Sequence, residues 1–312
     1  HVFPRLLLEF FLKTSGKRWK DTALPKDDPL VRFDGDHAHL YLPDQPMHQQ
    51  APFLALEEFP LQEQPNIREE IGEVALKTFL VLEKAWQLVG RRLVDFKVEF
   101  GTTADGGLRL ADVIDNDSWR VLDDGRYIDK QLYRDGADLD TVTAKYRLVA
   151  GLTGNFGIPR QQLILWRASE SDDLTPFEEA LAAYGAQGAC EVQIVTCSIH
   201  KEPVRAFEEI RRLVQEIPDS VVIAYVGRSN GAGPTLSAQT TVPVITVPAT
   251  WKEFPEDVWS SLRGPSETPV LTVLDPKNAV LSSLQILAMR NPRLYAELRS
   301  RQEKRLCNIV RI

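Results

Sequence analysis

The C-terminal half of the chain carries short apolar runs that polar or glycine-rich segments separate. Five of these runs have the length of β-strands, at residues 162–166, 191–196, 221–226, 242–247 and 270–273. Several of them are continuous aliphatic runs, as in strands that are covered on both faces, whereas half-exposed strands alternate apolar and polar positions. Helical spacing is found at residues 175–184, 278–288 and 292–307. The pattern predicts a doubly wound α/β domain with a parallel sheet.

The N-terminal half mixes strand patterns with one long amphipathic helix. Strand-like runs cover residues 6–11, 93–100 and 108–114. Apolar residues recur at helical spacing through residues 66–89, and residues 141–152 predict a second helix.

Glycine, asparagine and proline interrupt the helical pattern at residues 153–159. We therefore predict a first domain at 1–153, a linker at 154–160 and a second domain at 161–312.

Residues 93–100 alternate polar and apolar side chains. Asp95, Lys97 and Glu99 share one face of the predicted strand, and aromatic and aliphatic residues share the other. This alternation fits a strand that lines a binding site, and it equally fits an ordinary half-exposed strand.

Polar residues follow two neighbouring apolar runs of the second domain. Ser169, Ser171 and Asp172 come after the first run, where they fit either a phosphate and ribose site or an ordinary helix N-cap. His200 follows the next run, between Ser198 and Lys201. Ligands of open α/β sheets bind outside the carboxyl ends of the strands, so His200 is either a proton-transfer residue or a structural, hydrogen-bonded histidine.

Composition narrows the classes of partner. The net charge of −7 and the pI near 5.4 argue against a nucleic-acid or anionic-membrane surface. Three cysteines without metal-ligand spacing favour a reduced, cytoplasmic setting, and no apolar run is long enough to span a bilayer. Because the first residue is His1 rather than Met, we expect further sequence upstream.

Several motifs resemble known families. ASESD, SIHK and GRSNGAGP followed by PATWKEFPEDVWSSLR resemble the class II branch of phosphoribosylaminoimidazole (AIR) carboxylase. LLLEFFLK, KDDPLV, LVDFKVEFG, LADVIDNDSWR and DKQLYRD resemble the C-terminal portion of SAICAR synthetase. In this order the two halves resemble the bifunctional enzymes of purine biosynthesis. The resemblance implies a flavodoxin-like C-terminal sheet, preceded by an α+β domain that lacks its N-terminal ATP lobe.

For the second domain, the resemblance implies carboxylation of AIR with CO2 to 4-carboxy-AIR (CAIR), without a cofactor. His200 would move the C4 proton, because it follows the strand that ends at the site. Hydroxyls and a cation would bind the substrate phosphate, a carboxylate the ribose, and the glycine loop the imidazole and CO2. These residues are Ser169, Ser171, Asp172, Ser198, Lys201, Gly227, Arg228, Ser229 and Asn230.

For the first domain, the resemblance implies ATP-dependent ligation of CAIR to aspartate, giving SAICAR. Glu99 and Asp112 would hold Mg²⁺, and Lys97 would face the ATP phosphates. The imidazole nucleotide or aspartate would be bound by Asp28, Ser118, Arg120, Lys130 and Arg134. If the 312 residues were the whole molecule, we would expect no ligase activity, because the ATP lobe has no counterpart.

Two alternatives remain at this point. Ala168 and Ile199 stand where the carboxylase motifs have glycine and alanine, which leaves open a relative that acts on another heterocyclic nucleotide. A non-catalytic oligomerisation scaffold is the other alternative, because the resemblance also implies a homo-octamer built through the carboxylase domain.

Overall fold

The computed structural model describes residues 5–35, 37–56, 66–134, 136–228, 231–306 and 309–311. Packing divides the chain into two compact units. The first unit comprises His1–Phe79, Phe96–Trp119 and Arg299–Ile312, and the second comprises Leu80–Asp95 and Arg120–Leu298. The predicted linker at 154–160 follows a helix inside the second unit, and the division of the chain at that point remains a prediction.

A five-stranded parallel sheet forms the centre of the C-terminal half. Its strands are β13 (Gln162–Arg167), β14 (Glu191–Thr196), β15 (Ser220–Val226), β16 (Val244–Pro248) and β17 (Leu271–Thr272). They lie side by side in the order β14-β13-β15-β16-β17, and every pairing is parallel. Counted along the chain this is the order 2-1-3-4-5 of flavodoxin-like, doubly wound sheets, so the predicted fold class is confirmed.

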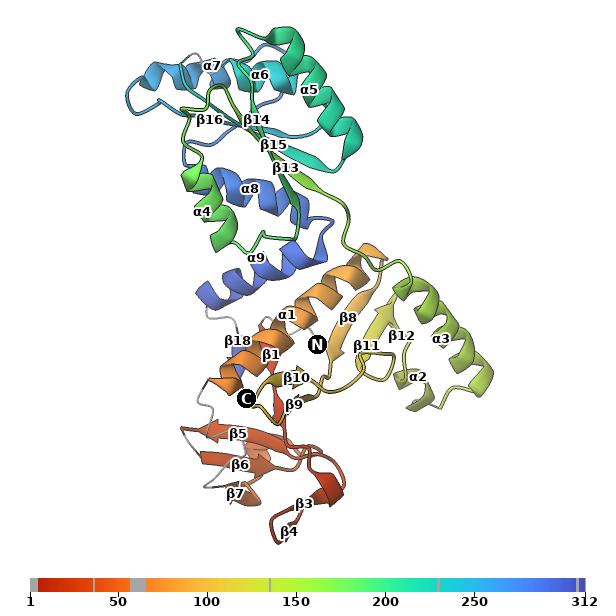
Figure 1. Cartoon of the computed structure of the whole chain (residues 1–312). Coiled ribbons are helices and arrows are strands. Elements are labelled where there is room, and N and C mark those ends of the chain that lie inside the picture. Colours follow the sequence, from red (N-terminus) through yellow and green to blue (C-terminus); the bar gives the residue numbers. More distant parts are fainter. Residues whose placement is uncertain are drawn as a thin grey trace. The chain divides into compact units, whose positions relative to one another are not determined.

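Helices cover both faces of this sheet, as Figure 1 shows. On one face lie α4 (Thr175–Ala183) and α8 (Pro276–Ala288), and on the other lie α5 (Pro203–Glu216) and α6 (Ala232–Ser237). Val221 and Ile223 of β15 pack in the first core, whereas Val222 and Ala224 pack in the second. Because both faces are buried, the strand is aliphatic at every one of these positions.

The remaining elements of this half are short, apart from one helix. They are η3 (Pro255–Val258), α7 (Trp259–Leu262) and α9 (Pro292–Arg305). Among the described residues, no helix combines the length and the apolar character that crossing a membrane requires.

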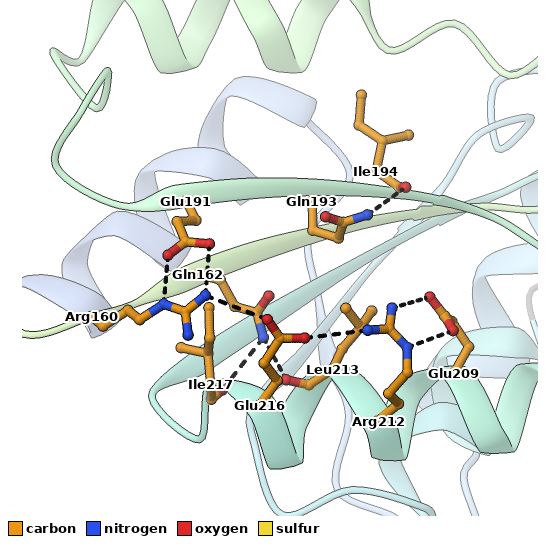
Figure 2. Close-up of polar contacts among 10 residues, drawn as sticks. All are labelled: Arg160, Gln162, Glu191, Gln193, Ile194, Glu209, Arg212, Leu213, Glu216 and Ile217. Atoms are coloured by element: carbon orange, nitrogen blue, oxygen red, sulfur yellow. Dashed lines mark hydrogen bonds and ion pairs between the residues drawn. The ribbon is translucent and has the colours of Figure 1, made fainter.

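A chain of ion pairs lies where β13 and β14 begin and α5 ends, at the opposite edge of the sheet from the carboxyl ends of the strands (Figure 2). The Arg160 guanidinium donates to Glu191 at 2.8 Å and to Glu216 at 3.4 Å. Arg212 donates to Glu216 at 3.2 Å and to Glu209 at 2.7 Å. Because four of these five side chains are half exposed or more, each pair contributes about 1 kcal/mol or less.

An antiparallel sheet of the order β2-β5-β6-β7 organises the first unit. Its strands are β2 (Phe10–Phe11), β5 (Leu30–Asp34), β6 (His37–Tyr41) and β7 (Leu54–Leu56). Its core contains Leu12, Val31 and Leu40, which are 7%, 1% and 0% exposed. Strand β1 (Leu6–Leu8) pairs with β18 (Ile309–Arg311), and β3 (Arg18–Trp19) forms a hairpin with β4 (Thr22–Ala23). The short helices are η1 (Ser15–Lys17) and η2 (Met47–Gln49).

The predicted long helix is α1 (Ile67–Leu88), and the second is α3 (Leu139–Thr153). The Asp138 carboxylate caps α3 by accepting the Thr141 N–H at 2.9 Å, which lowers the pKa of Asp138. The same half of the chain also contains β8 (Arg92–Phe96), β11 (Trp119–Asp123), β12 (Arg126–Tyr127), α2 (Gln131–Arg134), and the hairpin β9 (Phe100–Thr102) and β10 (Leu108–Leu110).

The prediction of one continuous strand at residues 93–100 was wrong. Strand β8 ends at Phe96, and β9 begins only at Phe100. Between them the backbone changes partner: the Lys97 N–H donates to the Ser118 carbonyl at 2.7 Å, whereas the Glu99 carbonyl accepts from Ala111 at 2.8 Å. Local alternation could not reveal this change, because it depends on two distant segments.

Candidate active site

The parallel register brings four loops to one edge of the sheet. Arg167, the last residue of β13, pairs with Thr196 of β14 and with Tyr225 of β15. The loops after β13 and β14 are joined directly, because the Cys197 N–H donates to the Arg167 carbonyl at 2.9 Å. In a sheet of order 2-1-3-4-5, the ligand crevice lies at the switch point between the first and third strands, here β13 and β15.

The loop after β13 presents two serine hydroxyls to solvent. The Ser171 hydroxyl and N–H lie 3.0 and 3.3 Å from the Ser169 oxygen, which accepts both. Asp172 Oδ2 accepts the N–H groups of Ala168 and Ser169 at 3.1 and 2.9 Å and so fixes the turn. Within the described part of the chain the Ser169 hydroxyl has no acceptor of its own, so its hydrogen can be donated to an anion such as phosphate.

Arg167 braces this loop, and sequence reasoning missed it. Its Nε donates to the Thr196 hydroxyl at 2.8 Å, and a terminal nitrogen donates to the carbonyls of Glu170 and Asp172 at 3.2 and 3.4 Å. An arginine at the end of an apolar run gives no sign of these partners, because two of them lie beyond the turn and one lies on another strand.

Tyr225 connects the loop to the third strand. Its ring packs edge-on against Phe177 at 4.9 Å between centroids. Burial, and then the charges of Asp172 and Asp173, raise the pKa of Tyr225. Asp172 therefore lies near enough to the end of β15 to act on it electrostatically, at the predicted switch point.

His200 lies in an exposed turn at the start of α5. The Ser198 carbonyl accepts the N–H groups of Lys201 and Glu202 at 3.1 and 2.8 Å, and this closes the turn. The His200 and Lys201 side chains are exposed, and within the described residues the imidazole has no hydrogen-bond partner. The ring is thus accessible to a ligand from solvent.

The two departures from the family motifs are accommodated by the protein core. Ile199 is 5% exposed and packs with Val195, Cys197 and Ala206, so its extra bulk lies in the core. Ala168 packs against the same cluster, and its φ is outside the left-handed region that favours glycine.

The loop after β15 adds Gly227 and Arg228; the predicted residues Ser229 and Asn230 lie outside the described residues. The Arg228 guanidinium lies over the Phe254 ring at 4.7 Å. Gly227 adjoins Thr250, whose buried hydroxyl has no hydrogen-bond partner among the described residues. Thr250 and Phe254 follow β16, so the fourth strand also contributes to this edge.

The predicted metal ligands of the first half lie in a cluster of charged residues. Glu99 is paired with Lys13 and, at 3.1 Å, with Lys97, and these lysines lower its pKa. Asp28 is paired with Lys17. Lys13 and Lys17 were not predicted, because only the folded chain brings residues 13 and 99 together.

The carboxylates of this cluster fit Mg²⁺. The backbones at Glu99 and Ala111 are hydrogen-bonded, which brings Asp112 close to Glu99. Mg²⁺ is usually held by one or two carboxylates with waters and substrate phosphates. Within the described residues no three His, Cys, Asp or Glu side chains form a metal cluster. Two carboxylates suit a cation whose other ligands are phosphate oxygens and waters.

The other predicted synthetase residues lie in two different units. The Ser118 hydroxyl, in the first unit, donates to the Val113 carbonyl at 2.8 Å. Arg120, in the second unit, pairs with Asp95, its Nε lying 2.9 Å from Oδ1. Lys130 and Arg134 belong to the second unit, beside and within α2.

Asp129 is a further residue that the sequence did not single out. Its side chain is fully buried, and its oxygens accept the N–H groups of Val121 at 2.5 Å and Gln131 at 2.8 Å. Burial raises the pKa of Asp129. The carboxyl group therefore joins β11 to α2 and fixes the backbone next to Lys130.

Two family models match the chain. Residues 164–306 match the family model of AIR carboxylase, and residues 44–150 match that of SAICAR synthetase. The chain belongs to the bifunctional AIR carboxylase/SAICAR synthetase family. The recognition made from ASESD, SIHK and LVDFKVEFG is thereby confirmed.

Relatives in this bifunctional family match across both halves. The probable multifunctional protein ADE2 of Caenorhabditis elegans is 36% identical over 255 residues, which are 78% of this chain and 60% of that protein. The bifunctional phosphoribosylaminoimidazole carboxylase/phosphoribosylaminoimidazole succinocarboxamide synthetase of Drosophila melanogaster is 35% identical over 233 residues, which are 72% of this chain and 54% of that protein. The chain thus spans little more than half the length of these relatives.

A solved structure, PurE of Treponema denticola, is 25% identical to this chain. The superposition has a TM-score of 0.43 and covers 47% of this chain and 93% of that one.

Proposed function

We propose that the C-terminal domain carboxylates AIR with CO2, giving CAIR, and catalyses the reverse decarboxylation. One observation carries the proposal: the loops after β13 and β14 carry Ser169, Ser171, Asp172, His200 and Lys201 at the same edge of the sheet, and β13 borders the switch point. Membership of the bifunctional family supports the same activity. The hydroxyls and Lys201 supply donors for the substrate phosphate, and the second oxygen of Asp172 suits the ribose hydroxyls.

The chemistry needs little beyond positioning. AIR is an electron-rich enamine, so its C4 attacks the carbon of CO2, a C–C bond forms, and one C–O π pair becomes the carboxylate. The C4–H bond then breaks: its proton passes to a His200 nitrogen, its electrons restore the aromatic ring, and His200 releases the proton to water. The exposed imidazole suits this shuttling. Backbone amides of the loop after β15 would stabilise the growing carboxylate.

We propose that the N-terminal half belongs to a SAICAR synthetase unit that ligates CAIR to aspartate with ATP. Glu99 and Asp112 would hold Mg²⁺, which would neutralise phosphate charge, and Lys97 would contact the phosphates. Asp28, Ser118, Arg120, Lys130 and Arg134 would contribute to the CAIR and aspartate sites. We further propose a cytoplasmic homo-octamer assembled through the carboxylase domain, in keeping with the family.

An ATP-free assay tests the carboxylase proposal. Purified protein is mixed with AIR and bicarbonate-derived CO2, and CAIR formation is followed by absorbance. We expect His200→Asn to lower kcat by roughly 10²- to 10⁴-fold, the usual contribution of a general acid–base group, with little change in KM. His48→Asn, at another exposed histidine, is the matched control and should keep full turnover.

Two outcomes would contradict the proposal. Unchanged turnover in His200→Asn would remove His200 from the mechanism. If folded protein bound AIR but formed no CAIR, the scaffold alternative would be favoured; if it did not bind AIR, a different heterocyclic nucleotide would be.

A further inference from the structure

Glu99 has both carboxylate oxygens occupied by lysines. Oε1 pairs with Lys97 at 3.1 Å, and Oε2 pairs with Lys13. The Glu99 side chain is 17% exposed, whereas that of Lys13 is 61% exposed. The carboxylate is therefore held in place, while the Lys13 ammonium reaches it from solvent and can leave without crossing the core.

The neighbouring backbone fixes the position of Lys13 beside Glu99. Leu12, the preceding residue, is 7% exposed in the core of the first unit, and its N–H donates to the Pro29 carbonyl at 3.0 Å. The Lys13 ammonium lies within the electrostatic reach of Glu99, Asp112 and Asp28, which together raise its pKa. The Lys13 charge thus acts on three carboxylates, including both predicted metal ligands, and two of the three also pair with another lysine.

A divalent cation at Glu99 would compete for a carboxylate oxygen that a lysine holds, and Lys13 holds Oε2. Mg²⁺ binds carboxylate oxygens at about 2.0–2.1 Å, and a lysine ammonium cannot share that oxygen at hydrogen-bonding distance without strong repulsion. The displaced ammonium remains at the end of a flexible four-carbon stem, so its positive charge can contact nearby phosphate oxygens.

We propose that Lys13 is a displaceable counter-ion of the metal site. Its ammonium neutralises Glu99 while no metal is bound, is expelled when a divalent cation binds, and then contacts the polyphosphate that the cation holds. This inference rests on the proposed Mg²⁺ site at Glu99 and Asp112. Lys13 is accordingly a positioning residue towards the metal and a binding residue towards phosphate.

Because Lys13 has these two roles, Lys13→Met should raise the affinity for the metal ion and lower the affinity for polyphosphate. Mn²⁺, used alone as a paramagnetic probe, should bind about two- to fivefold more tightly, because the weak, exposed ion pair between Lys13 and Glu99 no longer competes with the metal ion. Tripolyphosphate, titrated in saturating Mn²⁺, should bind roughly tenfold more weakly, because one charge-assisted hydrogen bond is lost. A residue with a merely structural role would weaken both.

The experiment uses the full chain and three variants, with thermal unfolding to confirm that each folds. Lys26→Met, at an exposed lysine of the same unit, should leave both affinities unchanged. Lys13→Arg keeps the charge and should retain the wild-type Mn²⁺ affinity. Unchanged Mn²⁺ affinity in Lys13→Met would overturn the inference and leave the metal site standing, whereas no Mn²⁺ binding by the parent protein would overturn the metal site itself.

Discussion

Replacing Gly233 with alanine should destabilise the C-terminal domain severely. Gly233 lies in α6, where a Cβ atom would come within 1.7 Å of Thr246 Cγ2 and 2.9 Å of Thr246 Cβ. Thr246 is fully buried on β16, with its hydroxyl 3.2 Å from that of Ser261 and 3.3 Å from that of Thr272. The helix and strand can separate only by opening this packing. The same helix follows the loop that carries Gly227 and Arg228.

The magnitude follows from two contributions. Overpacking of a filled core costs about 1–3 kcal/mol, and an overlap this deep belongs at the upper end. Rotating Thr246 away would also disrupt its buried hydroxyl contacts, at about 1 kcal/mol. We expect Gly233→Ala to lower the free energy of unfolding by roughly 3–4 kcal/mol, a large share of the 5–15 kcal/mol typical of a domain.

A double-mutant cycle followed by urea unfolding tests the cause. Thr246→Ser deletes the clashing Cγ2 and should cost about 1 kcal/mol alone, for one buried methyl group. Combined with Gly233→Ala, it should recover about 1.5–2 kcal/mol, so the two effects are not additive. Gly151→Ala, with no atom within 4 Å of its new Cβ, should stabilise α3 by about 0.5–1 kcal/mol. A loss below 1 kcal/mol for Gly233→Ala, or strict additivity, would refute the reasoning.

Two further predictions concern buried groups. Asn291→Ala should lower the free energy of unfolding, measured in urea, by roughly 2–4 kcal/mol. The fully buried amide donates to Gln161 and Ala189 and accepts two N–H groups at the start of α9. A loss below 1 kcal/mol would contradict this. Burial raises the pKa of Cys190 to about 11 from 9.0, so its thiol should react with Ellman's reagent about 100-fold more slowly at pH 8 than a thiol of ordinary pKa. Its rate should rise with pH; fast reaction in the native protein would refute this.

The sequence alone determined the fold class of the C-terminal half. Continuous aliphatic runs predicted strands buried on both faces, and β13, β15 and β16 are buried in this way. Polar residues after the first two runs marked the sheet edge where Ser169, Asp172 and His200 lie. These features are local, because strand length, helical period and turn residues are set by neighbours along the chain. The motifs also identified the bifunctional family, which the comparisons confirm.

Only the tertiary structure decided which side chains meet. The alternation at residues 93–100 predicted one strand, but the backbone exchanges one hydrogen-bonding partner for another between Phe96 and Phe100. The pairing of Lys13 with Glu99 spans 86 positions, and the brace from Arg167 to Thr196 spans 29. Ile199 showed the same limit, since its bulk beside His200 lies in the core. A pattern along the chain reports which face a residue occupies, whereas its partner depends on how distant segments pack.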